Sequence, residues 1–118
     1  MKILVIDDEM LDLFVSKRLL GAEFQVEGFN KLAEAVLWAK ENSFDVLLSD
    51  YYLGNGVSAQ DVLKALVEVR GKTFKSFVIT NYIDDKKKAE LRQAGFDGTI
   101  DKPLELAKFK SLVGIAGA

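Results

Sequence analysis

The sequence predicts an α/β fold in which helices cover both faces of a parallel sheet. Short, strongly apolar segments alternate with longer segments of helical periodicity along the whole chain, and no linker or low-complexity tract interrupts them. Strands that alternate with helices pair in parallel through right-handed crossovers. Five such strand–helix units fill the chain, so we expect one domain over residues 1–118.

Each expected strand is a short run bounded by polar or turn residues. The run over 3–6 is Ile-Leu-Val-Ile, and continuous apolar sequence is typical of a strand buried on both faces. The run over 24–29 alternates, which indicates a short, more exposed strand. The remaining strands are expected over 45–49, 76–80 and 97–100.

The first expected helix covers 10–20, where Leu11, Phe14, Val15 and Leu19 lie on one side and Gly21 is a suitable stop. A polar helix is expected over about 84–94. The other three helices are predicted from apolar residues at helical spacing. These residues are, helix by helix, Leu32, Ala35, Val36 and Ala39, which Asn30 would cap; Ala59, Val62, Leu63, Leu66 and Val67; and Leu106, Phe109, Leu112 and Val113.

The composition excludes several classes of chemistry. With 118 residues, 49% hydrophobic and 29% charged, the chain resembles a soluble globular domain. Its net charge of −2 gives no reason to expect nucleic acid or an anionic membrane as a direct partner. It contains neither cysteine nor histidine, which excludes disulfides, thiolate or imidazole metal ligands and histidine catalysis. The opening MKILVIDDE is too short for a signal peptide or membrane span, so we expect a cytoplasmic protein.

Polar residues follow four of the expected strands. Asp7 and Asp8 come after the first, Asp50 after the third, Thr80 ends the fourth, and Lys102 follows the fifth. Ligands of an open α/β sheet bind beyond the carboxyl ends of its strands. We therefore expect these five side chains to meet in one site.

The adjacent carboxylates of Asp7 and Asp8 indicate a cation site. Neighbouring carboxylates repel each other, and a cation offsets their charge. Carboxylate oxygens suit Mg²⁺, which also shares its ligand sphere with phosphate oxygens. Capping of the next helix explains the same two residues equally well when they are taken alone. Asp50, at the end of another central strand, favours the metal.

Asp50 is the candidate nucleophile. A carboxylate that attacks phosphorus forms an acyl phosphate, and that step needs a metal, a hydroxyl donor and a cation nearby. Thr80 and Lys102 would supply the last two. Lys102 precedes Pro103, so its backbone is held extended and the bond between them is a candidate for the cis form. The structural alternatives are a turn aspartate, a strand-end threonine and an exposed lysine before the last helix.

The segments VIDDE, LLSDYYL, FVIT and DKP, in this order and spacing, resemble the receiver domain of bacterial two-component response regulators, including the chemotaxis regulators. The resemblance covers essentially the whole chain. It implies a single receiver domain over 1–118 with a flavodoxin-like doubly wound sheet of strand order 2-1-3-4-5, an order of which this family is itself a well-known example. It further implies that Asp7, Asp8, Asp50 and the backbone carbonyl of Tyr52 bind Mg²⁺ or Mn²⁺.

The same resemblance implies a function in phosphorelay signalling. Asp50 matches the phosphoacceptor, Thr80 the switch hydroxyl and Lys102 the lysine that contacts the phosphoryl group. The donor would be a sensor histidine kinase, a phosphotransfer protein or a small phosphodonor. The domain would catalyse its own phosphorylation and dephosphorylation without being an enzyme for a separate substrate. A downstream protein would bind the last two helices and the last strand.

Four positions depart from the family pattern. Gly54 replaces a frequent proline, Ser58 a usual glycine, Asn81 a usual small residue, and Thr99 the usual aromatic switch residue. Two alternative functions stay open: an interaction module that is never phosphorylated, which Asn81 and Thr99 leave open, and a phosphohydrolase with an aspartyl nucleophile. The second needs another acid beside the nucleophile as a general acid or base, and the segment that follows Asp50 has none.

Overall fold

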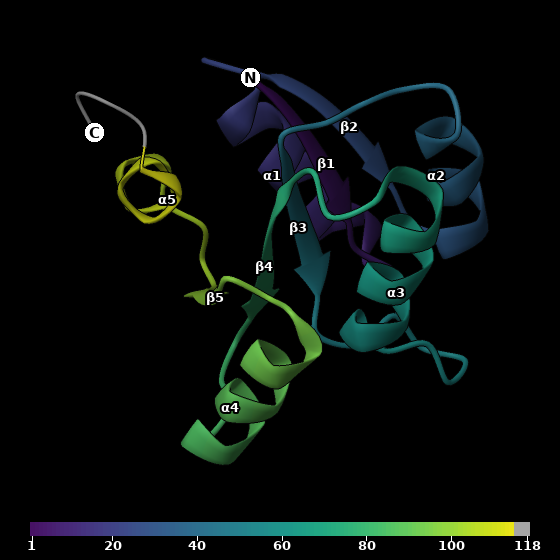
Figure 1. Cartoon of the computed structure of the whole chain (residues 1–118). Coiled ribbons are helices and arrows are strands. Elements are labelled where there is room, and N and C mark those ends of the chain that lie inside the picture. Colours follow the sequence, from purple (N-terminus) through teal and green to yellow (C-terminus); the bar gives the residue numbers. More distant parts are fainter. Residues whose placement is uncertain (115–118) are drawn as a thin grey trace.

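The computed structural model describes residues 1–114, in which five strands alternate with five helices (Figure 1). The predicted alternation is confirmed, and the strand ends lie at most one residue from the expected ones. The elements are β1 (Lys2–Ile6), α1 (Met10–Leu20), β2 (Gln25–Phe29), α2 (Leu32–Ala39), β3 (Val46–Asp50), α3 (Ala59–Arg70), β4 (Lys75–Thr80), α4 (Asp85–Ala94), β5 (Gly98–Asp101) and α5 (Leu106–Val113).

The strands form one parallel sheet in the order β2-β1-β3-β4-β5, as predicted. Because the chain runs from β1 outward to β2 and then returns to the other side of β1, the direction of winding reverses between β1 and β3. The helices that leave these two strands lie on opposite faces of the sheet. The ends of β1 and β3 therefore open the crevice in which ligands of this fold class bind.

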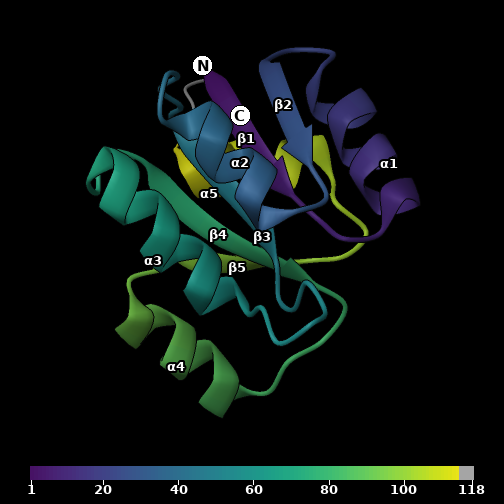
Figure 2. The ribbon, with the colours of Figure 1, turned by 90° about the vertical axis from the view of Figure 1, so that its right-hand side faces the viewer.

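Side chains that alternate along β1 separate two hydrophobic cores. Leu4 and Ile6 point to the face covered by α2, α3 and α4, whereas Ile3 and Val5 point to the face covered by α1 and α5. All four are almost completely buried. Figure 2 shows α2 and α3 in front of the sheet and α5 behind it. Burial on both faces explains why the central strands are continuously apolar.

The expected apolar side of α1 was wrong. Leu11, Phe14 and Val15 are more than half exposed, and α1 instead buries the side that carries Leu13 and Leu20. These two leucines pack in the same core as β1 and α5. Helical spacing fits either side of α1, because apolar residues surround most of this helix. Contact with the sheet, which periodicity does not reveal, selects the buried side.

Three further details differ from expectation. Lys31, not Asn30, occupies the N-cap position of α2, and its side chain makes no capping hydrogen bond. Ser58 begins α3 with a capping box, in which its hydroxyl accepts from the backbone N–H of Asp61 and the Asp61 carboxylate accepts from the backbone N–H of Ser58. Leu112 of α5 is 45% exposed. The capping box supplies a local structural reason for serine at position 58.

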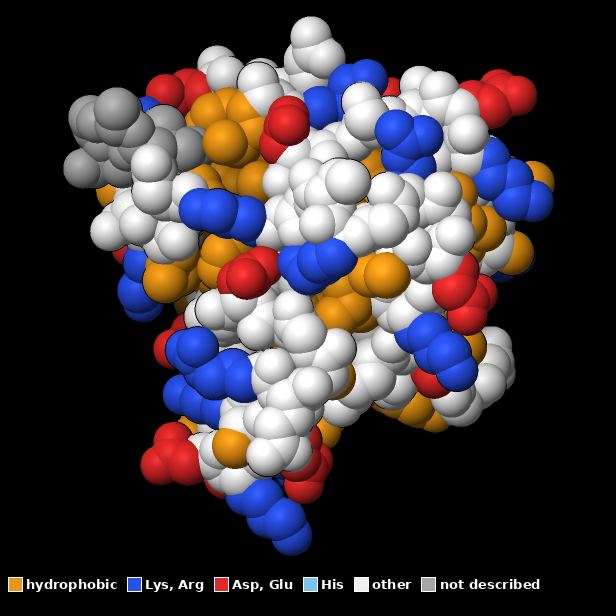
Figure 3. Space-filling model, viewed as in Figure 1, with side chains coloured by type: hydrophobic (Ala, Val, Ile, Leu, Met, Phe, Trp, Pro, Cys, Tyr) orange, Lys and Arg blue, Asp and Glu red, His pale blue; other side chains and the backbone are white. Residues whose placement is uncertain are grey.

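The surface carries charges of both signs. Figure 3 shows acidic and basic side chains close together over the lower part of the molecule, where α4 lies. Three consecutive lysines, 86–88, belong to this helix, which also carries Asp85 and Glu90. Such intermingling is typical of a solvated helix surface. Within residues 1–114, no helix has the length and apolar character needed to cross a membrane.

Candidate functional site

The register of the sheet brings the predicted site residues to one edge. Ile6 pairs with Ser49, so the next residues along the two strands, Asp7 and Asp50, lie at the same level. On the other side, Thr80 pairs with Asp101. Lys102 follows directly, and its backbone N–H donates a 2.8 Å hydrogen bond to the carbonyl oxygen of Thr80. The carboxyl ends of four strands thus meet, as predicted.

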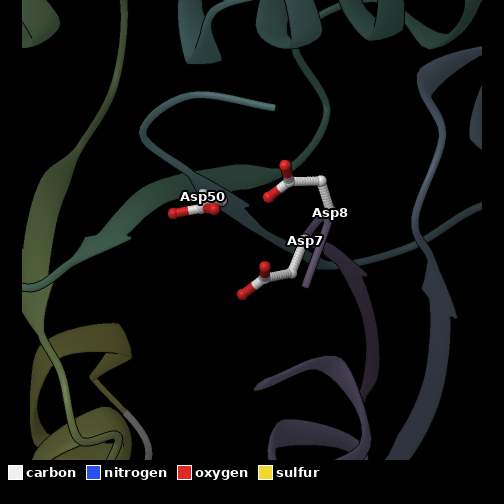
Figure 4. A group of neighbouring side chains, drawn as sticks. All are labelled: Asp7, Asp8 and Asp50. Carbon is white, nitrogen blue, oxygen red and sulfur yellow. The ribbon is translucent and has the colours of Figure 1, made fainter. Parts of the chain in front are cut away.

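Asp7, Asp8 and Asp50 form a compact acid cluster. One carboxylate oxygen from each lies within 4.8 Å of the others, and Figure 4 shows the three side chains gathered around a common space. Asp7 is buried, Asp50 is half-buried and Asp8 is exposed. Hard oxygen donors in this arrangement suit Mg²⁺. The donor set of this structure therefore fits the metal predicted from the sequence.

The capping alternative for Asp7 and Asp8 is wrong. Glu9 occupies the N-cap position of α1, and no side chain caps that helix end. Asp7 Oδ1 instead accepts a 2.9 Å hydrogen bond from the backbone N–H of Glu9, which fixes its carboxylate at the end of β1. Asp50 Oδ1 accepts a similar 2.9 Å bond from the backbone N–H of Tyr51. Both acids are therefore held by the backbone immediately after their strands.

Lys102 reaches into the acid cluster. Its Nζ lies 3.4 Å from Asp7 Oδ2 and 3.6 Å from Asp50 Oδ1, and its side chain is 14% exposed. The Lys102-Pro103 peptide bond is cis. Because the Lys102 side chain is largely buried, the structural alternative of an exposed lysine ahead of the last helix is wrong. Opposite charges from the ends of β1, β3 and β5 meet here.

A third acidic partner of Lys102 was not predicted. Nζ of Lys102 lies 2.9 Å from Asp12 Oδ2, closer than to Asp7 or Asp50. Asp12 stands in the first turn of α1, which begins two residues after Asp8. An acid in the first turn of a helix has a local explanation, so no pattern in the sequence indicated this contact with Lys102.

The excess of negative charge perturbs the titration of the site. Burial raises the pKa of Asp50 to about 6, and the nearby charge of Asp7 acts in the same direction. Burial also raises the pKa of Asp7, against the hydrogen bond from Glu9 and the charge of Lys102. Burial alone would lower the pKa of Lys102, but the hydrogen bond to Asp12 and the charges of Asp50 and Asp7 raise it above its ordinary value. Lys102 therefore stays charged, while Asp50 takes up a proton in mildly acidic solution.

The loop after β3 borders the cluster. A Cβ atom on Gly54 would lie 3.5 Å from Asp8 Oδ2, which places this loop against Asp8. Gly54, Asn55 and Gly56 all adopt left-handed backbone angles, with φ values of 78°, 52° and 78°. Glycine tolerates these angles best, so the glycines here are a requirement of the turn. The loop is closed by Tyr52, whose phenolic oxygen accepts a 2.9 Å hydrogen bond from the backbone N–H of Gly56.

The other predicted site residues have distinct environments. Thr80 is 8% exposed at the end of β4, whereas Tyr52 and Tyr82 are 52% and 81% exposed. Asn81 is exposed and Thr99 partly exposed. The side chain of Tyr52 is held through its phenol, by the bond from Gly56. Metal binding by the backbone carbonyl of Tyr52 stays a prediction.

A cavity of about 410 Å³ lies beside Lys102, on the side of α1. Asp12, Asn81 and Lys102 contribute its polar lining together with Glu9 and Ser16. The Lys102 ammonium thus stands between this cavity and the acid cluster. A side chain in that position can contact groups on either side.

Comparisons with known proteins agree with this architecture. Residues 3–114 match the sequence profile described as the response regulator receiver domain. None of the curated protein sequences compared with the chain gives a significant match. Among solved structures, the chain is similar to the chemotaxis protein CheY4 of Vibrio cholerae, with 25% identity and a TM-score of 0.81 over 96% of this chain and 95% of that one.

Two further structures share the fold. A CheY-like receiver domain protein from Methanospirillum hungatei has 22% identity and a TM-score of 0.81, over 96% of this chain and 90% of that one. A response regulator from Burkholderia pseudomallei, solved with a phosphorylated aspartic acid, a calcium ion and citrate, has 22% identity and a TM-score of 0.82, over 94% of this chain and 65% of that one. The profile match spans nearly the whole chain, so the chain belongs to the response regulator receiver domain family.

Proposed function

We propose that this chain is a single receiver domain over residues 1–118 that accepts a phosphoryl group on Asp50 in a two-component phosphorelay. One observation carries the proposal. Asp7, Asp50 and Lys102, which follow three different strands, converge so that the ammonium lies 3.4 and 3.6 Å from the two carboxylates. Folding alone does not require a buried acid, a nucleophile and a cation at this distance.

The proposed reaction forms one bond and breaks one. A carboxylate oxygen of Asp50 attacks phosphorus, the bond from phosphorus to the donor's nitrogen or oxygen breaks, and the leaving group takes a proton from solvent. The product is an acyl phosphate on Asp50. With a pKa of about 6, Asp50 is largely ionised at neutral pH and can act as the nucleophile. Hydrolysis of the acyl phosphate by water restores the carboxylate.

Asp7, Asp8, Asp50 and the backbone carbonyl of Tyr52 would hold Mg²⁺, or Mn²⁺ in its place. The ion supplies positive charge that offsets the phosphoryl oxygens. The acid cluster supports this assignment because its three carboxylates exceed the single positive charge of Lys102 beside them. Backbone N–H groups hold Oδ1 of Asp7 and of Asp50, so both carboxylates are already oriented at the ends of their strands.

Lys102 and Thr80 would respond to the new charge. A phosphoryl group adds about −1.5 to −2 charges at neutral pH. The Lys102 ammonium would contact it from the side of β5, and the Thr80 hydroxyl from the end of β4. Movement of these two side chains would shift a pre-existing equilibrium between two conformations. Thr99 is not aromatic, so this response does not involve rotation of a ring at that position.

The proposed partners follow from the family. A sensor histidine kinase or phosphotransfer protein would supply the phosphoryl group, and a downstream protein would bind the surface formed by α4, β5 and α5. We place this exchange in the cytoplasm, with no direct contact to nucleic acid or membrane. The mixed charges over α4 support a protein partner over a nucleic acid.

Intact-protein mass spectrometry tests the proposal. Wild type, Asp50→Asn and the matched control Asp45→Asn are incubated with Mg²⁺ and acetyl phosphate or phosphoramidate. Wild type and the control are expected to gain the mass of one phosphoryl group, and Asp50→Asn to gain none. No gain in wild type would favour an interaction module that is never phosphorylated. Sustained turnover of a phosphomonoester would favour a phosphohydrolase.

A further inference from the structure

The shortest ion pair of Lys102 points away from the proposed phosphorylation site. Its Nζ lies 2.9 Å from Asp12 Oδ2, compared with 3.4 Å from Asp7 and 3.6 Å from Asp50. Asp12 belongs to α1 and is not part of the acid cluster. The resting ammonium is therefore held most closely by a carboxylate on the cavity side of the site.

Lys102 donates its hydrogen bonds away from Asp50. Its ammonium donates to Asp12 at 2.9 Å and to Asp7 at 3.4 Å, whereas Asp50 Oδ1, at 3.6 Å, lies beyond hydrogen-bond distance. A phosphoryl group on Asp50 would add negatively charged acceptors on that side. To move toward them, the ammonium must lengthen its present contact with Asp12.

Asp12 is the contact that is released at the lowest cost. Its side chain is 37% exposed, compared with 2% for Asp7 and 14% for Asp50. Water can replace Lys102 at the partly exposed Asp12, whereas it reaches the buried Asp7 far less readily. The structure thus contains one exchangeable partner for the ammonium and two that belong to the acid cluster.

We propose that Asp12 is a positioning residue that holds Lys102 in a resting place and competes with a phosphoryl group on Asp50 for its ammonium. This inference rests on the proposed function of Asp50. Asp12 weakens retention of the phosphoryl group in two ways that act together. It binds the ammonium that would otherwise contact the phosphoryl oxygens, and its own negative charge repels them.

Beryllofluoride, a non-covalent mimic of a phosphoryl group on aspartate, provides the test. Its affinity is measured at saturating Mg²⁺ by calorimetry for wild type, Asp12→Asn, Asp12→Glu and Glu9→Gln. Glu9 is the matched control because it lines the same cavity but is not an ion-pair partner of Lys102 within residues 1–114. Asp12→Asn is expected to bind beryllofluoride about three- to fivefold more tightly, the effect of one partly exposed ion pair. Asp12→Glu should restore wild-type affinity, and Glu9→Gln should stay close to it.

Magnesium affinity, measured without beryllofluoride, separates positioning from a general structural role. Loss of the Asp12 charge should leave Mg²⁺ affinity unchanged or lower while beryllofluoride affinity rises. Parallel weakening of both ligands would overturn the inference, as would equal tightening in Glu9→Gln. If wild type binds beryllofluoride and Asp12→Asn binds it no better, the inference alone fails. If wild type with Mg²⁺ does not bind it, the proposed function fails and this inference with it.

Discussion

Asp7 and Asp50 end neighbouring parallel strands at the same level, and each accepts a 2.9 Å hydrogen bond from a backbone N–H that follows it in the chain. The backbone therefore fixes Oδ1 of each carboxylate, and Oδ2 of Asp7 lies 3.4 Å from Lys102 Nζ. The burial that positions these acids also raises the pKa of both. The site is electrostatically unfavourable until a cation or a proton reduces its negative charge.

Replacement of Asp50 by asparagine should stabilise the metal-free protein. The pKa of Asp50 is raised from 3.8 to about 6 in the folded state, so between about pH 4 and pH 6 the folded chain binds more protons than the unfolded chain. Stability should therefore fall as pH rises through this range. At neutral pH, Asp50→Asn should raise the free energy of unfolding by about 1 kcal/mol, a value discounted for partial solvent screening.

Urea unfolding in the presence of a chelator, at acidic and neutral pH, measures this effect. The matched control is Glu41→Gln, a surface carboxylate that precedes β3 and so lies at the opposite end of that strand. Relative to wild type at the same pH, only Asp50→Asn should become more stable as the pH rises from acidic to neutral. If both variants gain the same stability over wild type, the effect comes from the change in net charge and not from the acid cluster.

Magnesium affinity should depend on pH because the ion competes with protons for the same carboxylates. Below the pKa of Asp50, about 6, affinity should fall by up to about tenfold per pH unit for each proton displaced. Asp8→Asn should weaken binding across the whole pH range because it removes a negatively charged ligand from the cluster. Calorimetric titration with MgCl₂ measures both effects. An affinity that is constant through mildly acidic pH would contradict competition at Asp50.

Asp97 should stabilise the connection between α4 and β5. Its Oδ2 accepts hydrogen bonds from the backbone N–H of Ser76 at 2.8 Å and from Nζ of Lys72 at 3.2 Å. Partial burial raises the pKa of Asp97, but these bonds outweigh burial and hold it below its ordinary value. The resulting stabilisation is present above the ordinary pKa of aspartate and is lost as the pH falls through the lowered value.

Asp97→Ala should therefore lower the free energy of unfolding by about 1 kcal/mol at neutral pH, and by less in acid. The exposed α4 residue Glu90, changed to alanine, is the control. Chemical unfolding at both pH values provides the comparison, and a loss of equal size in acid would show that charge does not contribute.

The two exposed tyrosines should slow the loss of the phosphoryl group. Tyr52 and Tyr82 stand two residues beyond Asp50 and Thr80, and bulky rings there would obstruct the in-line approach of water. Tyr52→Asn and Tyr82→Ala should each accelerate autodephosphorylation. Tyr52→Phe keeps the ring but removes the hydrogen bond to Gly56, so its rate should match wild type. Unchanged rates in the first two variants would mean that the rings only cover the loops.

The sequence was sufficient to predict most of the fold because each central strand is continuously apolar and each strand is followed by helical periodicity. The sequence was insufficient where a helix has apolar residues on two sides. In α1, Leu11 and Phe14 compete with Leu13 and Leu20 for the core, and only contact with the sheet favours the second pair. The cap of α2 was predicted at Asn30 because of residue type, whereas the helix begins one residue later, after Lys31.

The candidate site was predictable for a different reason. Asp7, Asp8, Asp50 and Lys102 lie at the ends of strands, and parallel strands deliver their ends to one edge regardless of sequence distance. Asp12 escaped prediction because it lies within a helix, where an acid in the first turn already has a local explanation. Its contact with Lys102 joins residues 90 positions apart, and no local pattern encodes such a pair.

Chemical trapping of the phosphorylated residue tests the central claim most directly. The protein is incubated with Mg²⁺ and acetyl phosphate and then reduced with borohydride, which converts an acyl phosphate on aspartate to homoserine, and its peptides are sequenced by mass spectrometry. We predict homoserine at position 50 in the wild-type chain. Reduction at another aspartate, or none under conditions where a known receiver domain is modified, would contradict the account.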